Sequence, residues 1–265
     1  MTVSPSACAS YTARPRILQT KALKVFEWSF QWWSTAHASA GLCQHNGDNC
    51  QNMSHRVRCE LLAIQPLDAV EQVHLDDAIA WVDSGAPLYR VGKPATPPKH
   101  LVSYFAVIDN GSILLVDHRN AQLWLPAGGH VELDEDPRRT VVRELKEELG
   151  LDVALHAVGP PTMVTVTETV GLTAGHTDVS LWYVVQGNRA AKIEFDQSEF
   201  DAVRWFAFAH LPLHRCEPHL KRFIAKLACP DSSDMHLHTD QINRCAYALE
   251  PPDDKSDSAT DRIQR

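Results

Sequence analysis

The sequence predicts an α/β domain in which strands and helices form separate layers. A strand-like pair, "LVSYFAVID" and "SILLVDH", is joined by Asp109-Asn110-Gly111, which is a strong signal for a tight hairpin turn. A helical pattern follows at residues 137–149, and the strand-like runs "MVTVTETVGL", "VSLWYVVQG" and "AVRWFAF" come after it. An amphipathic helix carrying Leu220, Phe223, Ile224 and Leu227 closes the series. Strands mixed with helices in this order are typical of a layered α/β domain.

Residues 53–98 are predicted to form a small helical extension with a proline-rich connector, ahead of the main domain at 99–229. From about Arg58 to Gly85 two apolar series follow each other at helical spacing. "KPATPPK" is then an extended connector, because proline fixes φ and disfavours helix before it. Residues 230–265 are rich in Asp, Ser and Pro and predict a disordered tail.

Residues 1–52 differ from the rest of the chain, and three interpretations of them stay open. They hold three of the seven cysteines, and "WSFQWW" contains three tryptophans. The segment is either translated upstream sequence before a natural start at Met53, or a partner-binding or membrane-surface helix, or a targeting segment. Ordinary disorder is a further alternative. We expect residues 53–229 to fold and to retain full activity without either flank.

Composition narrows the function. The formal net charge of −8 argues against a protein that grips a nucleic acid polymer, but a small anion is compatible with it if a bound metal supplies positive charge. The seven cysteines are odd in number and include no CxxC pair, which favours a reducing cytoplasm over a disulfide framework. No apolar run approaches the ~18 residues of a membrane span. Oligomeric state is left open.

The 137–149 helix has clear ends and a crowded acidic face. Asp136 is placed to cap it and Gly150 to end it in the left-handed conformation. At 100° per residue, one face is apolar and the neighbouring face holds three carboxylates, Glu144, Glu147 and Glu148. Like charges at this spacing repel each other, so a divalent cation is expected to compensate them. Mg²⁺ suits carboxylate oxygens and commonly shares its coordination with phosphates, and Mn²⁺ is an alternative.

The loop before this helix, "PAGGHVE", suggests an anion site. Its glycines, Gly128 and Gly129, are expected to permit tight left-handed turns that bring Glu132 and Glu135 over the acidic face. Backbone amides in such a loop can point at an anion. Together the loop and the helix predict a phosphate site built on a metal.

The spacing of these residues resembles the Nudix box. Gly129, Glu135 and the run from Arg143 to Leu151 match it at every fixed position. The resemblance covers roughly residues 100–228. It implies an α/β/α sandwich around a mixed sheet and hydrolysis of a nucleoside diphosphate linked to another group.

The resemblance also implies residue roles. Glu144, Glu147 and Glu148 are the expected metal ligands, and Glu135 is a supporting residue. Glu132 is a further metal candidate because of its place in the loop. One box glutamate, or a carboxylate elsewhere, would deprotonate the attacking water. Arg143 is expected to orient a box glutamate.

Outside the box, five residues are candidates with weaker support. Glu199 lies six residues before Trp205, where mutator-type Nudix enzymes carry a further metal-linked carboxylate. The candidates for contact with substrate, besides the loop glycines, are Arg119, Trp124, His176 and Asp178.

Substrate identity is not specified by the sequence. The signature residues of the ADP-ribose, diadenosine polyphosphate, NADH and coenzyme A subclasses are missing. We expect hydrolysis of a (deoxy)nucleoside triphosphate, ordinary or oxidised, to the monophosphate and pyrophosphate. The alternatives are hydrolysis of ADP-ribose or another nucleoside diphosphate derivative, and a non-catalytic nucleotide-binding regulator.

Overall fold

The computed structural model describes residues 53–93 and 95–228, so the predictions for 1–52 and 230–265 lie outside the described residues. The helices are α2 (Met53–Ala63), α3 (Ala69–Asp83), α4 (Pro137–Leu149) and α5 (Leu220–Ala228). The strands are β1 (Lys99–Asp109), β2 (Ser112–His118), β3 (Leu123–Leu125), β4 (Ala127–His130), β5 (Met163–Glu168), β6 (Thr177–Gln186) and β7 (Phe200–Ala207).

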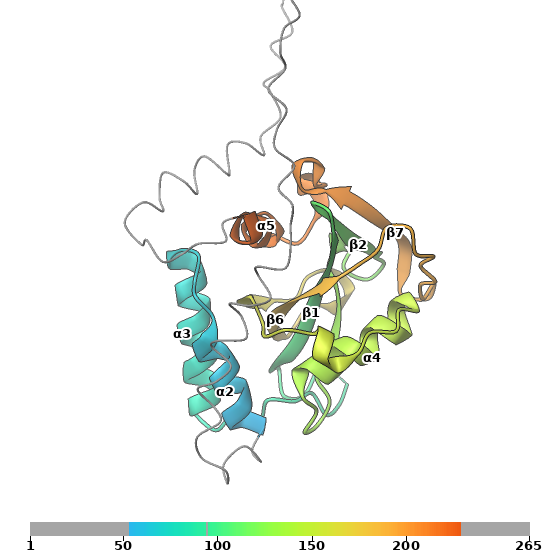
Figure 1. The fold of residues 1–265 in the computed structure, drawn as a ribbon. Helices are drawn as coiled ribbons and strands as arrows, with labels where there is room; N and C mark the ends of the chain where they lie inside the picture. The colour runs from blue at the N-terminus through green and yellow to red at the C-terminus, as the bar shows by residue number, and fades with distance from the viewer. Residues whose placement is uncertain (1–52, 94, 229–265) are drawn as a thin grey trace, which may run out of the picture.

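The strands form one mixed sheet with the order β3-β2-β1-β6-β5. Figure 1 labels β2, β1 and β6 of this sheet. β1 runs parallel to β6, and the other pairings are antiparallel. β4 pairs with the first half of β1, and β2 pairs with its last residues, so both share one edge of β1. This arrangement lays the start of the glycine-rich loop directly along the central strand.

Helices cover both faces of the sheet, which confirms the α/β/α sandwich. One core joins α4 to the sheet through Phe105, Leu145 and Leu181. A second core, on the opposite face, packs Phe223 of α5 against Trp182. Each helix buries one apolar stripe, as the periodicity predicts.

The predicted hairpin and the predicted helix are both confirmed. Asn110 and Gly111 have φ of 45° and 72°, the positive values that a two-residue hairpin turn needs. Asp136 accepts from the amide of Arg138 at the start of α4, and Gly150 ends the helix with φ of 64°. α2 begins at Met53 rather than near Arg58, because its apolar series extends back to the fully buried Val57.

The expectation for the glycine pair was wrong in one respect. Gly128 and Gly129 do not adopt left-handed turns; they lie within β4, paired with Tyr104 and Ser103 of β1. Pairing with β1 satisfies their backbone groups better than a turn would. Their lack of a side chain serves close approach by neighbouring groups instead of a special φ.

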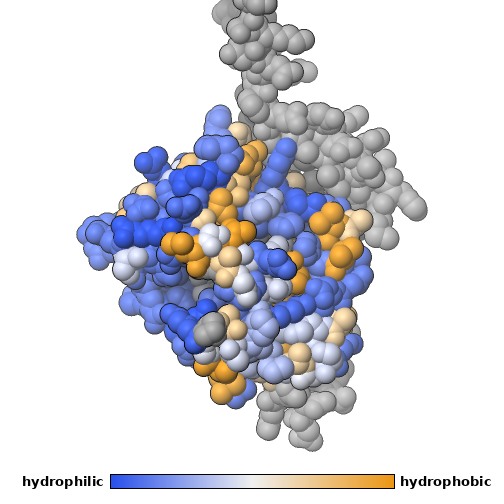
Figure 2. Space-filling view, turned by 180° about the vertical axis from the view of Figure 1, so that it is seen from behind, coloured by the Kyte–Doolittle hydropathy of each residue, from blue (hydrophilic) through white to orange (hydrophobic). Residues whose placement is uncertain are grey.

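The surface has ordinary mixed polarity. In Figure 2 the apolar side chains on the face shown form separate groups among polar ones. Scattered apolar groups are normal on a folded domain. None of the described helices is both long enough and apolar enough to cross a membrane.

Leu61→Ala should lower the free energy of unfolding by about 2–5 kcal/mol, because Leu61 is fully buried in the core that α2 and α3 share with the sheet. Leu62→Ala is the matched control, since Leu62 is 52% exposed and should cost less than about 0.5 kcal/mol. Urea unfolding measures both. Equal effects of the two substitutions would show that the helical pair is not part of this core.

Candidate active site

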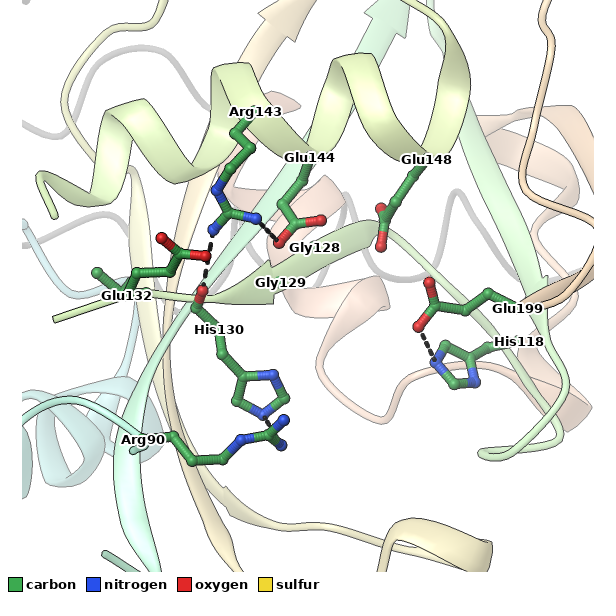
Figure 3. Close-up of a pocket in the computed structure, with 11 residues that line it drawn as sticks. Arg90, His118, Gly128, Gly129, His130, Glu132, Arg143, Glu144, Glu148 and Glu199 are labelled. Atoms are coloured by element: carbon green, nitrogen blue, oxygen red, sulfur yellow. Dashed lines mark hydrogen bonds and ion pairs between the residues drawn. The ribbon is translucent and has the colours of Figure 1, made fainter. Parts of the chain in front are cut away.

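β4, α4 and the loop that joins them line a pocket of about 390 Å³ (Figure 3). Its walls come from β2, β4, α4, the segment after α3 and the loop before β7. The lining residues are Arg90, His118, Gly128, Gly129, His130, Val131, Glu132, Arg143, Glu144, Glu148 and Glu199. Four of them, Glu132, Glu144, Glu148 and Glu199, are carboxylates from the predicted set.

Glu148 is the most constrained acid in the pocket. It is 5% exposed, and its Oε2 atom has no hydrogen-bond partner among the described residues. Burial, followed by the charge of Glu144 and then that of Glu199, raises the pKa of Glu148 to about 9. A buried carboxylate without a partner for one oxygen is costly, so the site favours a proton or a cation at that atom.

Glu144 reaches the pocket because position 129 is glycine. A Cβ built on Gly129 would lie 1.9 Å from Oε1 of Glu144, which is far inside contact distance. Position 128 is also too tight for a side chain, since a Cβ there would lie 2.5 Å from the carbonyl oxygen of Ser103. The two glycines therefore let α4 and the central strand approach β4 closely.

Arg143 holds the loop and the helix together. Its Nη1 donates to Glu144 over 2.6 Å, and its Nη2 donates to Glu135 over 3.0 Å and to the carbonyl oxygen of His130 over 3.2 Å. The other contacts of Glu135 Oε2 are the Thr140 hydroxyl at 2.7 Å and the Glu132 amide at 3.1 Å. Arg143 thus orients Glu144, and the oxygens of Glu135 are occupied in fixing the loop.

Glu147 and Glu199 are more exposed to solvent than Glu144 and Glu148. Glu147 has a side chain that is 61% exposed, with Oε2 3.4 Å from Nη1 of Arg143. Glu199 lies across the pocket from α4, and its Oε1 is 4.0 Å from Nε2 of His118 (Figure 3). Burial lowers the pKa of His118, so the ring is a neutral neighbour of the acids near pH 7.

Nitrogen-bearing side chains line the end of the pocket beyond Gly129. Nη1 of Arg90 lies 3.0 Å from Nε2 of His130. Burial, and then the charge of Arg90, lowers the pKa of His130 to about 3, so this imidazole is neutral and accepts from Arg90. Arg90 is therefore the charged donor at this end, where an anionic group of a substrate would meet it.

Two predicted substrate contacts lie outside the pocket. Arg119 donates to Asp201 over 2.7 Å in an exposed pair. Trp124 is 7% exposed and packs edge-on against Phe206 in the α5-side core. Trp124 therefore lies in the core and not in the pocket, because the strand pleat turns its ring inward.

His176 and Asp178 form a separate group with His100 and His130 at the start of β6. They adjoin the pocket through His130, which is a lining residue.

Sequence reasoning did not select Arg90, His118 or His130. His130 directly follows Gly129, and this position next to the glycine pair was the signal that could have identified it as a pocket residue. Arg90 had none, because its approach depends on tertiary folding of the segment after α3.

Residues 99–227 match the family model described as "NUDIX domain". The chain belongs to the Nudix hydrolase superfamily. The matched span holds the whole sheet, α4 and nearly all of α5.

Two relatives are similar over part of this Nudix chain. A CTP pyrophosphohydrolase of Escherichia coli (strain K12) is 44% identical over 55 residues, which are 19% of this chain and 41% of that protein. A MutT-like protein of Streptomyces ambofaciens is 30% identical over 112 residues, 42% of this chain and 66% of the relative. The chain thus spans less than two thirds of the length of each relative.

Among solved structures, the solution structure of the Escherichia coli ORF135 protein aligns with a TM-score of 0.38 and 28% identity. The alignment covers 51% of this chain and 95% of that one.

The Nudix pocket fits a divalent cation. Its acids Glu144, Glu148 and Glu199 offer oxygen donors, and the buried Oε2 of Glu148 has no hydrogen-bond partner among the described residues. Hard cations such as Mg²⁺ prefer such oxygens. Glu144, Glu148 and Glu199 are the residues placed to hold one.

Gly129→Ala should lower kcat on the order of 100-fold, because the added methyl would push the Glu144 carboxylate away from its position. Gly159→Ala is the control, since a Cβ there meets nothing within 4 Å. Steady-state kinetics with a hydrolysed nucleotide, together with a thermal unfolding check, would measure the effect. Full activity of Gly129→Ala would remove the close-approach argument.

The raised pKa of Glu148 predicts that, with metals removed by a chelator, the free energy of unfolding depends on pH. An unfolded glutamate releases its proton near pH ~4.3, whereas folded Glu148 keeps it up to about 9. Between these values the folded chain binds one proton more than the unfolded chain, so this contribution falls as pH rises. The unfolding free energy of the wild type should therefore fall relative to that of Glu148→Gln as pH rises. Added Mg²⁺ should reduce this fall. Parallel pH profiles for the two chains would contradict the assignment.

Proposed function

We propose that this chain is a Mg²⁺-dependent pyrophosphohydrolase that converts a nucleoside triphosphate to the monophosphate and pyrophosphate. The observation that carries the proposal is the buried Oε2 of Glu148, which has no hydrogen-bond partner in the described part of the chain and lies in a pocket shared with Glu144 and Glu199. An acidic pocket repels phosphates unless a cation is present, so metal and substrate are expected to bind together.

The reaction requires a water oxygen to bond to phosphorus while the bridging P–O bond breaks. The bridging oxygen leaves with the departing phosphate group, and the proton of the water goes to a carboxylate. A bound Mg²⁺ would neutralise phosphate charge and keep the surrounding carboxylates ionised. Oε2 of Glu148 is assigned to the metal, so a second carboxylate of the pocket, Glu144 or Glu199, is left to accept the proton.

The other residues position these carboxylates and the substrate. Arg143 fixes the Glu144 carboxylate from behind, with Glu135 holding the guanidinium in place. Glu199 faces α4 from the opposite wall (Figure 3). Arg90 supplies a positive charge at the far end, where the phosphate group remote from the metal would lie.

A triphosphate is supported by the kind of relatives and by the pocket. The short match to a CTP pyrophosphohydrolase and the longer match to a MutT-like protein both favour nucleotide hydrolysis. The pocket, about 390 Å³, falls in the range of ordinary small-ligand sites. ADP-ribose and other nucleoside diphosphate derivatives are the second substrate class.

A non-catalytic nucleotide-binding module is the alternative of a different kind. Such a module has no need of a complete acid set. This chain retains every box carboxylate, and two of them, Glu144 and Glu148, converge on one pocket.

Glu148→Gln should lower kcat by about 100-fold or more with the fold intact, because it removes a metal-binding charge from the pocket. Glu199→Gln should cost about 10-fold, since Glu199 is the more exposed acid. Saturating Mg²⁺ and matched circular dichroism spectra serve as controls. Near wild-type turnover by Glu148→Gln would refute the metal assignment.

A substrate panel tests the triphosphate proposal. It contains dGTP, 8-oxo-dGTP, CTP, the other dNTPs, ADP-ribose, NADH and diadenosine tetraphosphate, with products resolved by chromatography. We expect a triphosphate to give the highest kcat/KM, with close analogues separated by only ~10–200-fold. A higher kcat/KM for ADP-ribose or a dinucleotide would overturn the substrate and leave the family assignment standing. No hydrolysis of any compound would favour the binding module.

A further inference from the structure

A second group of metal-binding side chains lies beside the pocket, at the end of the sheet where β1 and β6 begin. His100 of β1 and Asp178 of β6 are direct partners in the parallel register. His130 ends β4, and His176 lies just before β6. One ligand atom from each of these four residues lies within 4.8 Å of the other three.

The hydrogen bonds of His100 leave its inner nitrogen as a bare acceptor. Its Nδ1 lies 2.9 Å from the carbonyl oxygen of Pro97, which can only accept, so Nδ1 carries the proton. Nε2 therefore presents a lone pair. The His100 side chain is fully buried, and this Nε2 has no hydrogen-bond partner within 53–93 and 95–228.

His176 can adopt the same arrangement. The Thr169 hydroxyl lies 3.1 Å from the carbonyl oxygen of His176 and 3.2 Å from Nδ1 of its ring. When the hydroxyl donates to the carbonyl oxygen, Nδ1 carries the ring proton and Nε2 presents a lone pair. Both Nε2 atoms lie 3.4 Å from the same atom, Oδ1 of Asp178.

Two imidazole Nε2 atoms and one carboxylate oxygen thus converge on one point. Buried lone pairs that face each other are unfavourable unless a proton or a cation lies between them. In a tetrahedral zinc site with bonds of ~2.0–2.2 Å, neighbouring ligand atoms are about 3.3–3.5 Å apart. The two 3.4 Å separations match that geometry.

The geometry points to a second metal site, in which His100, His176 and Asp178 bind a transition metal of the zinc class. Mixed imidazole and carboxylate donors suit zinc, whereas the oxygen-only acids of the pocket suit Mg²⁺. The fourth position faces His130, whose Nε2 accepts from Arg90. Because His130 also lines the pocket, a metal here would lie next to the bound substrate. This inference stands independently of the proposed hydrolase activity.

The test is calorimetric titration of the full chain with Zn²⁺ after removal of metals, in excess Mg²⁺. We expect one Zn²⁺ per chain with an affinity that falls on the order of 100-fold in Asp178→Asn and in His176→Gln. Glu148→Gln should keep the wild-type Zn²⁺ affinity, as should His214→Ala, which removes an exposed histidine outside the group. The chain has 14 histidines and seven cysteines, so the comparison of variants is decisive.

Near-ultraviolet circular dichroism checks the fold of each variant, and His176→Gln carries the test if Asp178→Asn does not fold, because His176 is partly exposed. Equal Zn²⁺ affinity of the folded variants and the wild type would overturn the site. A loss of Zn²⁺ binding in Glu148→Gln alone would place the metal in the acidic pocket and equally overturn it. Absence of Zn²⁺ binding by the wild type would also overturn the site and show that the group is an ordinary His–Asp contact.

Discussion

The candidate active site depends on one guanidinium. Arg143 is the donor that ties the loop after β4 to α4, through Glu135, Glu144 and the carbonyl oxygen of His130. Burial alone would lower the pKa of Arg143, but its bonds to Glu135 and Glu144 outweigh that effect and raise it. A planar fork with a fixed charge suits this task, because it satisfies several acceptors in one geometry. Without it, Glu135 and Glu144 would lose the guanidinium that both of them contact.

A second buried network fixes the start of the same helix. Asp136 caps α4 with one oxygen, and its other oxygen accepts from Arg56 of α2 over 2.8 Å. Tyr183 of β6 donates to Glu60 over 3.1 Å, and burial raises the pKa of Glu60 to about 7. The N-terminal helical pair thus helps to orient α4, because Arg56 of α2 holds the Asp136 cap of that helix. The pair therefore does more than cover the sheet.

Local sequence signals were enough to predict the helix and the hairpin turn, whereas the positions of several site residues depend on tertiary contacts. The bounds of α4 and the hairpin turn follow from capping and turn residues, so the sequence predicted both correctly. Gly129 was recognised as necessary for the wrong reason, because close approach by Glu144 is invisible until two elements are packed. Trp124 shows the same limit, since the face to which a strand residue points depends on its register. Arg90 is brought to the pocket from a segment with no motif.

β4 connects the two groups of acceptors through a single residue. The carbonyl oxygen of His130 accepts from Arg143, which orients the acids, while its ring lies among His100, His176 and Asp178. Because Arg90 donates to that same ring, any group that draws His130 away would also release a positive charge at the end of the pocket. A rigid strand transmits such a change with little loss. The sheet register that places His100 opposite Asp178 therefore also sets how closely the nitrogen-rich group and the acidic pocket can influence each other.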